Sequence, residues 1–283
     1  MLLVEGLGRL GVEQRLLARG PLLDRAYARP WSPVRLLRDL AWCDLVHAHD
    51  AGGHRWAAAF AGRKPIVVSR RVAFPLRRGL LSGWKRRRAT IWLAVSRHVR
   101  ERLIEGGVDA GQIEVVYDGL PPPAQEPLFQ PASEQPTVLI VDSEDPLKLT
   151  DLAVSACRRA GLPMLRTSNL EADLPRAGAF LYLTASEGLG SALIRASFAK
   201  KAIVASDVGG VPEIIEHERT GLLTANEVEG VAASLRRFVR EPALARDCAE
   251  AAFRQAEERF HADIMVARTI EAYRRVLASA SPA

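Results

Sequence analysis

A glycine-rich turn between two apolar runs carries the clearest chemical signal in this sequence. The apolar run 179–183 ends in Ser186, Glu187, Gly188, Leu189, Gly190 and Ser191, and a helical pattern follows at once. A strand, a glycine turn and a helix in this order direct free backbone N–H groups and the positive end of the helix dipole at one point, which suits a phosphate. Glu187, at the end of the predicted strand, can accept hydrogen bonds from hydroxyl groups beside it. A diphosphate next to hydroxyl groups indicates a nucleotide sugar, and an ordinary buried βαβ unit is the alternative.

A second glycine turn follows the next apolar run. Residues 202–205 are closed by Ser-Asp-Val-Gly-Gly-Val-Pro-Glu at 206–213. The whole segment 185–215 resembles the donor-site signature of the retaining, GT-B-fold nucleotide-sugar glycosyltransferases of family 4, also called glycosyl transferases group 1. The resemblance implies a metal-independent transfer of a sugar from a nucleotide-diphosphate sugar to a hydroxyl acceptor, with no other cofactor. It also implies that Glu187 contacts the donor sugar and that residues 188–191 line the donor site.

Two positions depart from the family pattern. The family uses an Arg and a Lys five residues apart after the first strand of the second domain; here Lys148 fits the Lys position, but Ser143 stands at the Arg position. The family's second Glu, which takes the ribose hydroxyls, is replaced by Arg195. Arg195 could pair with Glu187 or supply the phosphate with the positive charge that position 143 lacks. Otherwise the chain is a catalytically silent, glycosyltransferase-like binding protein, and Lys148 is an ordinary solvated loop lysine.

The first half of the chain extends the resemblance to the acceptor side. Residues 44–50 resemble the family's strand that ends in His-x-His. His49 and Asp50 follow that strand at its carboxyl end, where open parallel sheets place ligands. We therefore expect His49, with Glu187 and Lys148, to be catalytic. A histidine that merely caps a loop is the alternative for His49.

A strongly basic region follows these acceptor-side positions. Between Arg63 and Arg102 there are thirteen Lys or Arg residues and a single acid. Arg70 and Arg71, near its start, are expected to meet an anionic acceptor, lipid-linked or phosphorylated; a salt-bridged surface pair is the alternative. Residues 77–88 are the densest part, and Trp84 lies within them, which favours contact with an anionic membrane surface over nucleic acid binding. A solvated basic face is the alternative.

Length and composition indicate a two-domain globular protein. At 283 residues the chain is longer than one hydrophobic core usually holds. No apolar run approaches the roughly 18–20 residues that span a bilayer, and the N-terminus does not resemble a secretory signal. The sequence has three cysteines, Cys43, Cys157 and Cys248. Their odd number and wide separation indicate neither a disulfide framework nor a metal site. We therefore expect a cytoplasmic protein, attached peripherally to the inner face of the membrane.

Short apolar runs alternate with helical patterns, which predicts an α/β protein with two Rossmann-like parallel sheets that face a cleft, the GT-B architecture. We expect an acceptor-side domain at 1–120 without the family's usual first strand, a Pro-rich linker at 121–136 and a donor domain at 137–283. The expected strands are 15–18, 45–47, 66–69, 91–95, 114–116, 137–141, 164–166, 180–183, 203–205 and 221–223. The expected helices are 2–9, 57–61 with its flanks, 97–105, 150–160, 191–199, 229–240, 242–259 and 262–277.

One motif points elsewhere. Residues 6–11 spell Gly-Leu-Gly-Arg-Leu-Gly, a literal dinucleotide-binding fingerprint, with Asp24 near the expected distance. That motif requires a strand before it and a helix after it. The leucines around it instead follow a helical spacing that Gly11 would end. An NAD(P)-dependent oxidoreductase is therefore the less favoured alternative.

Overall fold

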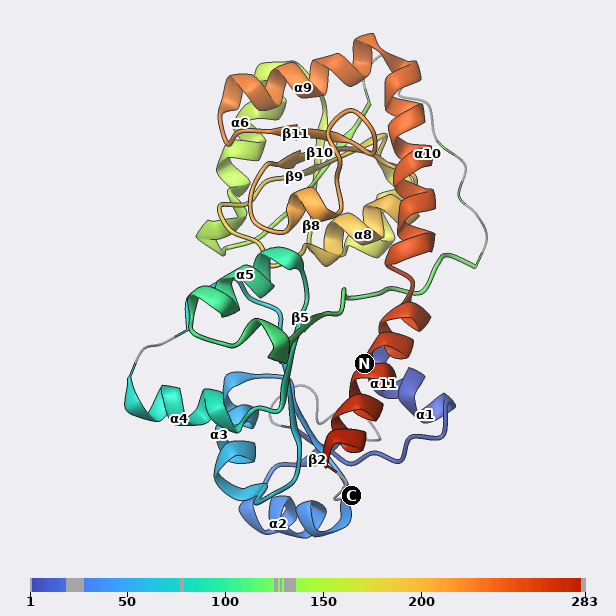
Figure 1. The fold of residues 1–283 in the computed structure, drawn as a ribbon. Helices are drawn as coiled ribbons and strands as arrows, with labels where there is room; N and C mark the ends of the chain where they lie inside the picture. The colour runs from blue at the N-terminus through green and yellow to red at the C-terminus, as the bar shows by residue number, and fades with distance from the viewer. Residues whose placement is uncertain are drawn as a thin grey trace. The chain divides into compact units, whose positions relative to one another are not determined.

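The computed structural model describes residues 2–18, 28–76, 79–124, 127, 129 and 136–280 (Figure 1). It divides into two compact units. The first comprises Met1–Val95, Arg100–Val116 and Met265–Ala283, and the second comprises Ser96–Val99 and Tyr117–Ile264. The chain therefore returns to its first unit at the C-terminal end. The expected donor domain 137–283 was too long at this end, because the last helix packs its apolar face into the core of the first unit.

The first unit is built on a four-stranded parallel sheet in the order β3-β4-β5-β6. Its strands are β3 Val46–Ala48, β4 Ile66–Arg70, β5 Ile91–Ala94 and β6 Ile113–Val115, and a separate parallel pair is formed by β1 Leu16–Ala18 and β2 Ala28–Pro30. The helices are α1 Leu2–Arg9, α2 Pro33–Trp42, α3 Ala51–Phe60, α4 Leu80–Arg88, α5 Arg97–Glu105 and α11 Ala262–Ala280. Leu3 and Leu7 of α1 pack with Val67, Leu93 and Tyr273 in one core cluster.

The second unit holds a five-stranded parallel sheet in the order β11-β10-β9-β7-β8. Its strands are β7 Val138–Val141, β8 Met164–Thr167, β9 Ala179–Tyr182, β10 Ala202–Ser206 and β11 Leu222–Thr224. Its helices are α6 Thr150–Ala160, α7 Leu170–Asp173, α8 Ser191–Phe198, α9 Val228–Arg240 and α10 Pro242–Arg259. Strands β9 and β10 are buried along their whole length, as continuous apolar runs in a parallel sheet with helices on both faces should be.

The α/β class and the parallel sheets are confirmed. The linker is described only in part, and its described residues 121–124 form neither helix nor strand. Two helices in the first unit were not expected. Helix α2 leaves Val34 and Leu37 exposed, so its apolar residues do not mark a buried stripe. Helix α4 ends in four consecutive basic residues, so its sequence lacks the apolar periodicity from which a helix is predicted.

The dinucleotide fingerprint is a helix. Gly6 and Gly8 lie inside α1, and Asp24 lies outside the described residues. A Cβ atom on Gly6 would come within 2.3 Å of Val266 Cγ2, so this glycine permits close packing against helix α11. The motif has the glycines of a phosphate turn without the strand and turn that such a site needs, and the oxidoreductase alternative loses its support.

Candidate active site

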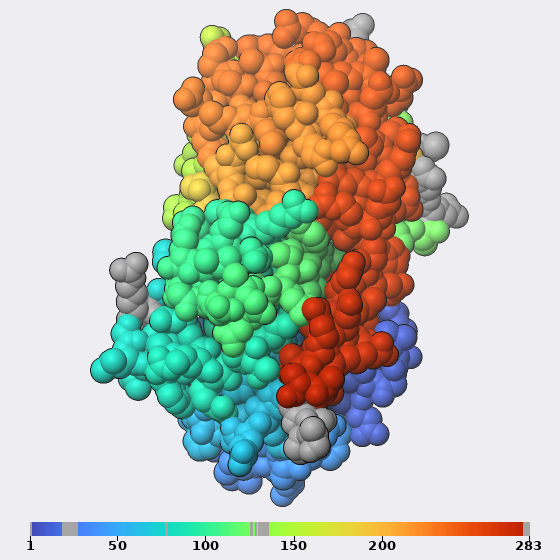
Figure 2. Space-filling model, viewed as in Figure 1, coloured from blue at the N-terminus to red at the C-terminus, as the bar shows by residue number. Residues whose placement is uncertain are grey.

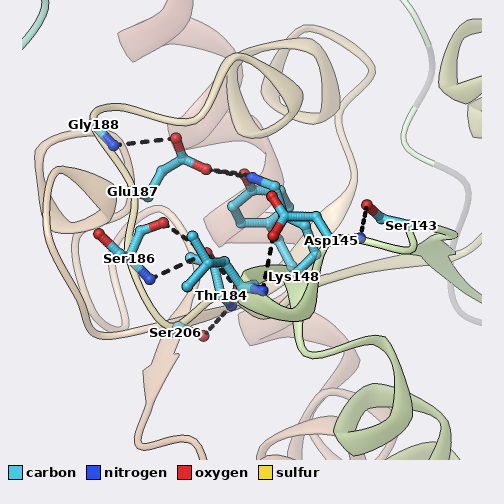
Figure 3. A network of polar contacts seen from close by, with 10 residues as sticks. Ser143, Asp145, Lys148, Thr184, Ser186, Glu187, Gly188 and Ser206 are labelled. Carbon is cyan, nitrogen blue, oxygen red and sulfur yellow. Dashed lines mark hydrogen bonds and ion pairs between the residues drawn. The ribbon is translucent and has the colours of Figure 1, made fainter. Parts of the chain in front are cut away.

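A lysine, a glutamate and a tyrosine meet in the second unit, at the carboxyl end of β9 (Figure 3). Lys148 Nζ lies 2.7 Å from Glu187 Oε2 and 2.9 Å from the Tyr182 hydroxyl. The Tyr182 hydroxyl donates to the same carboxylate oxygen, and the Gly188 N–H donates to Glu187 Oε1 at 3.1 Å. Both oxygens of Glu187 are therefore held by donors, and its cationic partner is Lys148 instead of the suggested Arg195.

These contacts keep Glu187 ionised. Burial opposes the charged form, but the hydrogen bonds from Lys148 and Tyr182 outweigh it, so the pKa of Glu187 lies below its ordinary value. Burial, with the charge of Glu187 and the hydrogen bond to it, raises the pKa of Tyr182. The cluster thus holds a carboxylate and a neutral phenol beside an ammonium group.

The loop that carries Lys148 is tied to the end of β9. A 3₁₀ turn, Pro146–Lys148, begins at Asp145, whose carboxylate accepts from the Leu147 N–H. The Leu147 carbonyl accepts from the Ala185 N–H at 2.8 Å and from the Thr184 hydroxyl at 3.0 Å. These bonds hold Lys148 beside Glu187 across a long sequence separation.

The two glycine turns of the sequence motif are stacked backbone against backbone. The Gly210 N–H donates to the Glu187 carbonyl at 3.1 Å. A Cβ atom on Gly210 would lie 2.1 Å from the Gly188 carbonyl oxygen, and one on Gly209, whose φ is +58°, would lie 2.3 Å from the Glu187 carbonyl oxygen. Only glycine permits this approach. The second turn therefore fixes the backbone of the first.

Helix α8 begins directly after the first turn. Its N-cap residue is Gly190, in a left-handed conformation, and no side chain caps the helix. An N-terminus without a side-chain cap can offer its N–H groups to an anion. Ser191 is exposed at the first helical position, whereas Leu189 is buried. Residues 188–191 were all expected to line the donor site. The side chain of Leu189 is instead packed in the protein interior.

The two positions that depart from the family pattern have local partners. Arg195 Nη1 lies 3.2 Å from Glu171 Oε2, at the surface, so it does not pair with Glu187. Ser143 Oγ accepts from the Asp145 N–H at 3.2 Å and stabilises its own loop. Of the three acids around it, Asp142 pairs with Arg166 and Asp145 caps the 3₁₀ turn, whereas Glu144 is exposed.

The glutamate that ends the second glycine motif has a structural contact. Glu213 Oε2 and Oε1 accept from the backbone N–H groups of Arg97 and His98, each at 2.8 Å, and Tyr117 donates to Oε2 at 2.9 Å. Glu213 thus caps the start of α5. The hydroxyl of Ser96, the residue before Arg97, donates to the Gly188 carbonyl at 2.6 Å.

In the first unit, His47 and His49 lie together at the end of β3, with ring centroids 4.0 Å apart. His47 Nε2 lies 2.8 Å from Ser69 Oγ and its Nδ1 lies 2.6 Å from the Tyr273 hydroxyl. The His49 side chain still contacts solvent, but the protein groups packed around the ring, together with the charge of Arg71, lower its pKa to about 4. A neutral imidazole at this position can accept a proton or a hydrogen bond from a hydroxyl group.

The other acceptor-side residues have identifiable contacts. The Asp50 carboxylate accepts from the Gly53 N–H at 2.7 Å and caps α3, which is a structural role. Arg70 donates to the Phe74 carbonyl, and burial lowers its pKa. Arg71 is exposed. In the described part of the chain, no group of three or more His, Cys, Asp or Glu side chains is placed to hold a metal ion.

Sequence analysis did not identify Tyr182 or the network behind the turn. The Thr184 N–H donates to Ser206 Oγ, and Ser206 donates in turn to Asn226 Oδ1 at 2.5 Å. Tyr182 could have been found from the sequence as the one hydroxyl-bearing residue in the apolar run 179–183, five positions before Glu187.

None of the helices in the described ranges combines the length and apolar character needed to cross a bilayer.

Parallel sheets in two units and a glycine turn before an uncapped helix define a GT-B-type protein. Residues 136–255 match the family model of the glycosyl transferases group 1, and residues 3–122 match that of glycosyltransferase family 4. The chain belongs to this family of GT-B glycosyltransferases.

Known proteins show the same likeness. The α-maltose-1-phosphate synthase of Mycolicibacterium smegmatis is 34% identical over 122 residues, which are 41% of this chain and 32% of that protein. The chain thus matches about a third of the length of this relative. The fold resembles a glycosyltransferase of Rickettsia africae (TM-score 0.77, 17% identity, covering 98% of this chain and 93% of that chain). It also resembles Anabaena HepE in complex with UDP-glucose (TM-score 0.74, 16% identity, covering 91% and 90%).

Proposed function

We propose that this chain transfers a sugar from a nucleoside diphosphate sugar to a hydroxyl acceptor, with retention of configuration and without a metal ion. The observation that carries the proposal is the ionised Glu187, held by Lys148 at 2.7 Å beside the uncapped start of α8. Family membership supports the reaction class. The UDP-glucose bound to HepE supports a nucleotide-sugar donor.

In this proposal the second unit carries the donor. Glu187 accepts hydrogen bonds from the sugar hydroxyls, while Lys148 and the N–H groups at the start of α8 stabilise the leaving diphosphate. Preorganised charges and dipoles of this kind need little reorganisation as charge develops. The departing phosphate takes the acceptor proton, and His49, neutral at physiological pH, orients the acceptor hydroxyl.

The decisive experiment measures UDP release from UDP-glucose by the purified protein, with and without a chelator, together with thermal stabilisation by UDP. A ligand at a hundredfold excess over Kd should raise stability by about 2.7 kcal/mol. The anomer formed, read by NMR, tests retention. Stabilisation by several nucleoside diphosphates with neither hydrolysis nor transfer of any sugar would instead favour the silent binding protein.

Arg195 distinguishes an adapted site from a disabled one. In the adapted site its guanidinium leaves Glu171 and meets the diphosphate, so Arg195→Ala weakens UDP binding by about 1.5–3 kcal/mol, as expected for a hydrogen bond to a charged group. Uridine should bind equally to both proteins. Arg195→Glu should then bind UDP still more weakly. Tighter binding or gained transfer in Arg195→Glu would mean that the natural arginine disables the site.

We further propose a cytoplasmic location with peripheral attachment to the inner face of the membrane through α4. Leu80 and Leu81 on this helix are 94% and 83% exposed, beside basic residues 85–88; Arg77 and Arg78 lie outside the described residues. Figure 2 shows the teal atoms of this segment at the surface.

The test is attachment of the protein to anionic vesicles, which should weaken as salt is added. Each basic residue near the membrane surface should contribute about 1 kcal/mol of binding free energy. Leu80→Ser with Arg87→Gln should reduce it, and equal binding to neutral and anionic vesicles, or none to either, would refute it.

A further inference from the structure

A pocket of about 800 Å³ lies within the first unit. Its walls come from helices α3 and α4, from the segment that follows β4, and from Trp92 of β5. Such a volume accommodates a ligand of drug-like size. The pocket lies in the described part of the chain and is separate from the Lys148–Glu187 cluster, which belongs to the second unit.

Two buried ring nitrogens in the pocket wall have no hydrogen-bond partner among the described residues. They are His54 Nε2 and Trp92 Nε1, on side chains that are 1% and 2% exposed. The two rings meet edge to face, with centroids 5.1 Å apart. Buried polar atoms are nearly always satisfied, and an indole nitrogen can only donate. A ligand with an acceptor oxygen would satisfy Trp92 Nε1, whereas His54 Nε2 is an acceptor in the neutral ring.

The same walls carry an excess of positive charge. Arg55, Arg70 and Lys85 all line the pocket. Burial and the charges of Arg55 and Arg70 lower the pKa of Lys85, which shows that these cations disfavour one another. Neither Arg55 nor Lys85 forms an ion pair with a residue of the described ranges. The carboxylate of Asp50, the single acid in the wall, is already engaged by the Gly53 N–H. An anion would relieve this repulsion.

The remaining wall is apolar and open to solvent. Phe74, Leu81 and Trp84 line the pocket and each is exposed. An anion alone would leave these side chains in water, whereas an alkyl chain attached to it would cover them and gain about 25 cal/mol per Å² of apolar surface. The wall therefore suits a ligand with a charged head and an apolar tail.

We propose that this pocket binds an amphiphilic phosphate ester. Its phosphate oxygens accept from Trp92 Nε1 and Lys85, and its alkyl part lies along Phe74, Leu81 and Trp84. As a site for the acceptor it rests on the proposed function and names the acceptor's class. As a binding site it does not depend on that function.

The test is binding of octyl phosphate, followed by calorimetry or by tryptophan fluorescence. Lys85→Gln should raise Kd about tenfold or more, and Trp92→Phe, which removes only the N–H, about threefold to tenfold. Arg38→Gln is the matched control: it removes the same charge from an exposed position on α2 of the same unit and should change Kd less than about twofold. Octyl glucoside, with the same tail and no charge, should bind at least about tenfold more weakly.

The ligand arms separate the sources of phosphate. Tighter binding of soluble dihexanoylphosphatidylglycerol than of octyl phosphate identifies a lipid headgroup, and the reverse order identifies a phosphate monoester; both keep the site. Inorganic phosphate binding as tightly as octyl phosphate, unchanged binding in Lys85→Gln and Trp92→Phe, or equal binding of octyl glucoside would overturn the proposal. UDP binding is measured in the same proteins. If the wild-type protein binds octyl phosphate but releases no UDP from UDP-glucose, the result counts against the proposed function alone.

Discussion

The Gly210 N–H donates to the Glu187 carbonyl oxygen at 3.1 Å, so a glycine from one turn fixes the backbone of the acid in the other. This contact explains why the two parts of the motif, 186–191 and 206–213, need their spacing. The first turn presents Glu187 and the start of α8, and the second holds that turn from behind.

Glu187→Gln should slow transfer by about tenfold to a thousandfold, the range expected for losing one good transition-state contact. The amide keeps the size of the side chain but loses the charge that pairs with Lys148, so the free energy of unfolding should also fall, by about 1–3 kcal/mol. Initial rates with UDP-glucose and a melting curve measure both. Glu144→Gln is the matched control, because Glu144 is exposed on the nearby loop. Wild-type turnover in Glu187→Gln would remove this residue from the mechanism.

Gly210→Ala should destabilise the protein by about 1–3 kcal/mol, the usual cost of overpacking, and weaken UDP binding. The added methyl group would meet a backbone carbonyl at 2.1 Å, and a backbone atom cannot move aside as a side chain can. Urea unfolding and UDP titration are the measurements. Gly8→Ala should be neutral or slightly stabilising, because its nearest neighbour is a side-chain atom at 3.5 Å. Equal stability of the two variants would contradict the stacked-turn geometry.

Glu213→Gln should lower stability by about 0.5–2 kcal/mol, because it weakens the cap of α5 and the hydrogen bond from Tyr117. The glycosyl-transfer rate should fall less than in Glu187→Gln, since the carboxylate is bound to backbone N–H groups and a phenol. Glu227→Gln provides the comparison: Glu227 is the N-cap of α9 but its side chain makes no capping bond. A large rate loss with unchanged stability would assign Glu213 to substrate instead.

His54 should make the protein sensitive to acid. Burial, with the charge of Lys85, lowers its folded-state pKa to about 4, whereas the unfolded value is about 6.5. Above pH 6.5 both states are neutral and no stability is lost; between pH 6.5 and 4 only the unfolded state gains a proton, so stability falls by up to about 3 kcal/mol. His54→Leu should reduce the loss of urea midpoint between pH 7 and 5. His217→Gln, at an exposed site, should leave it unchanged. Identical pH slopes in His54→Leu and wild type would refute this origin.

Much of the fold follows from local patterns. The helices 2–9, 97–105, 150–160 and 242–259 have the bounds that the sequence predicts, because their apolar spacing and their glycine or proline boundaries act within a few residues. The expected strands agree with the observed ones to within a residue or two for the same reason, whereas β2, Ala28–Pro30, was not expected. Helices α2 and α4 escape such analysis because they expose apolar residues or end in a run of like charges.

The candidate site shows the limit of the sequence. Residue types and spacing alone determined the α/β class, the glycine turns and the presence of Glu187 and Lys148. Only the tertiary structure decided that Lys148 contacts Glu187 and Tyr182, that Arg195 turns to Glu171, that Glu213 caps a distant helix, and that the last helix returns to the first unit. The physical reason is one of range: backbone periodicity is set by neighbours in the chain. The partner of a charged side chain depends on which strand ends the sheet order brings together, and no local pattern encodes that.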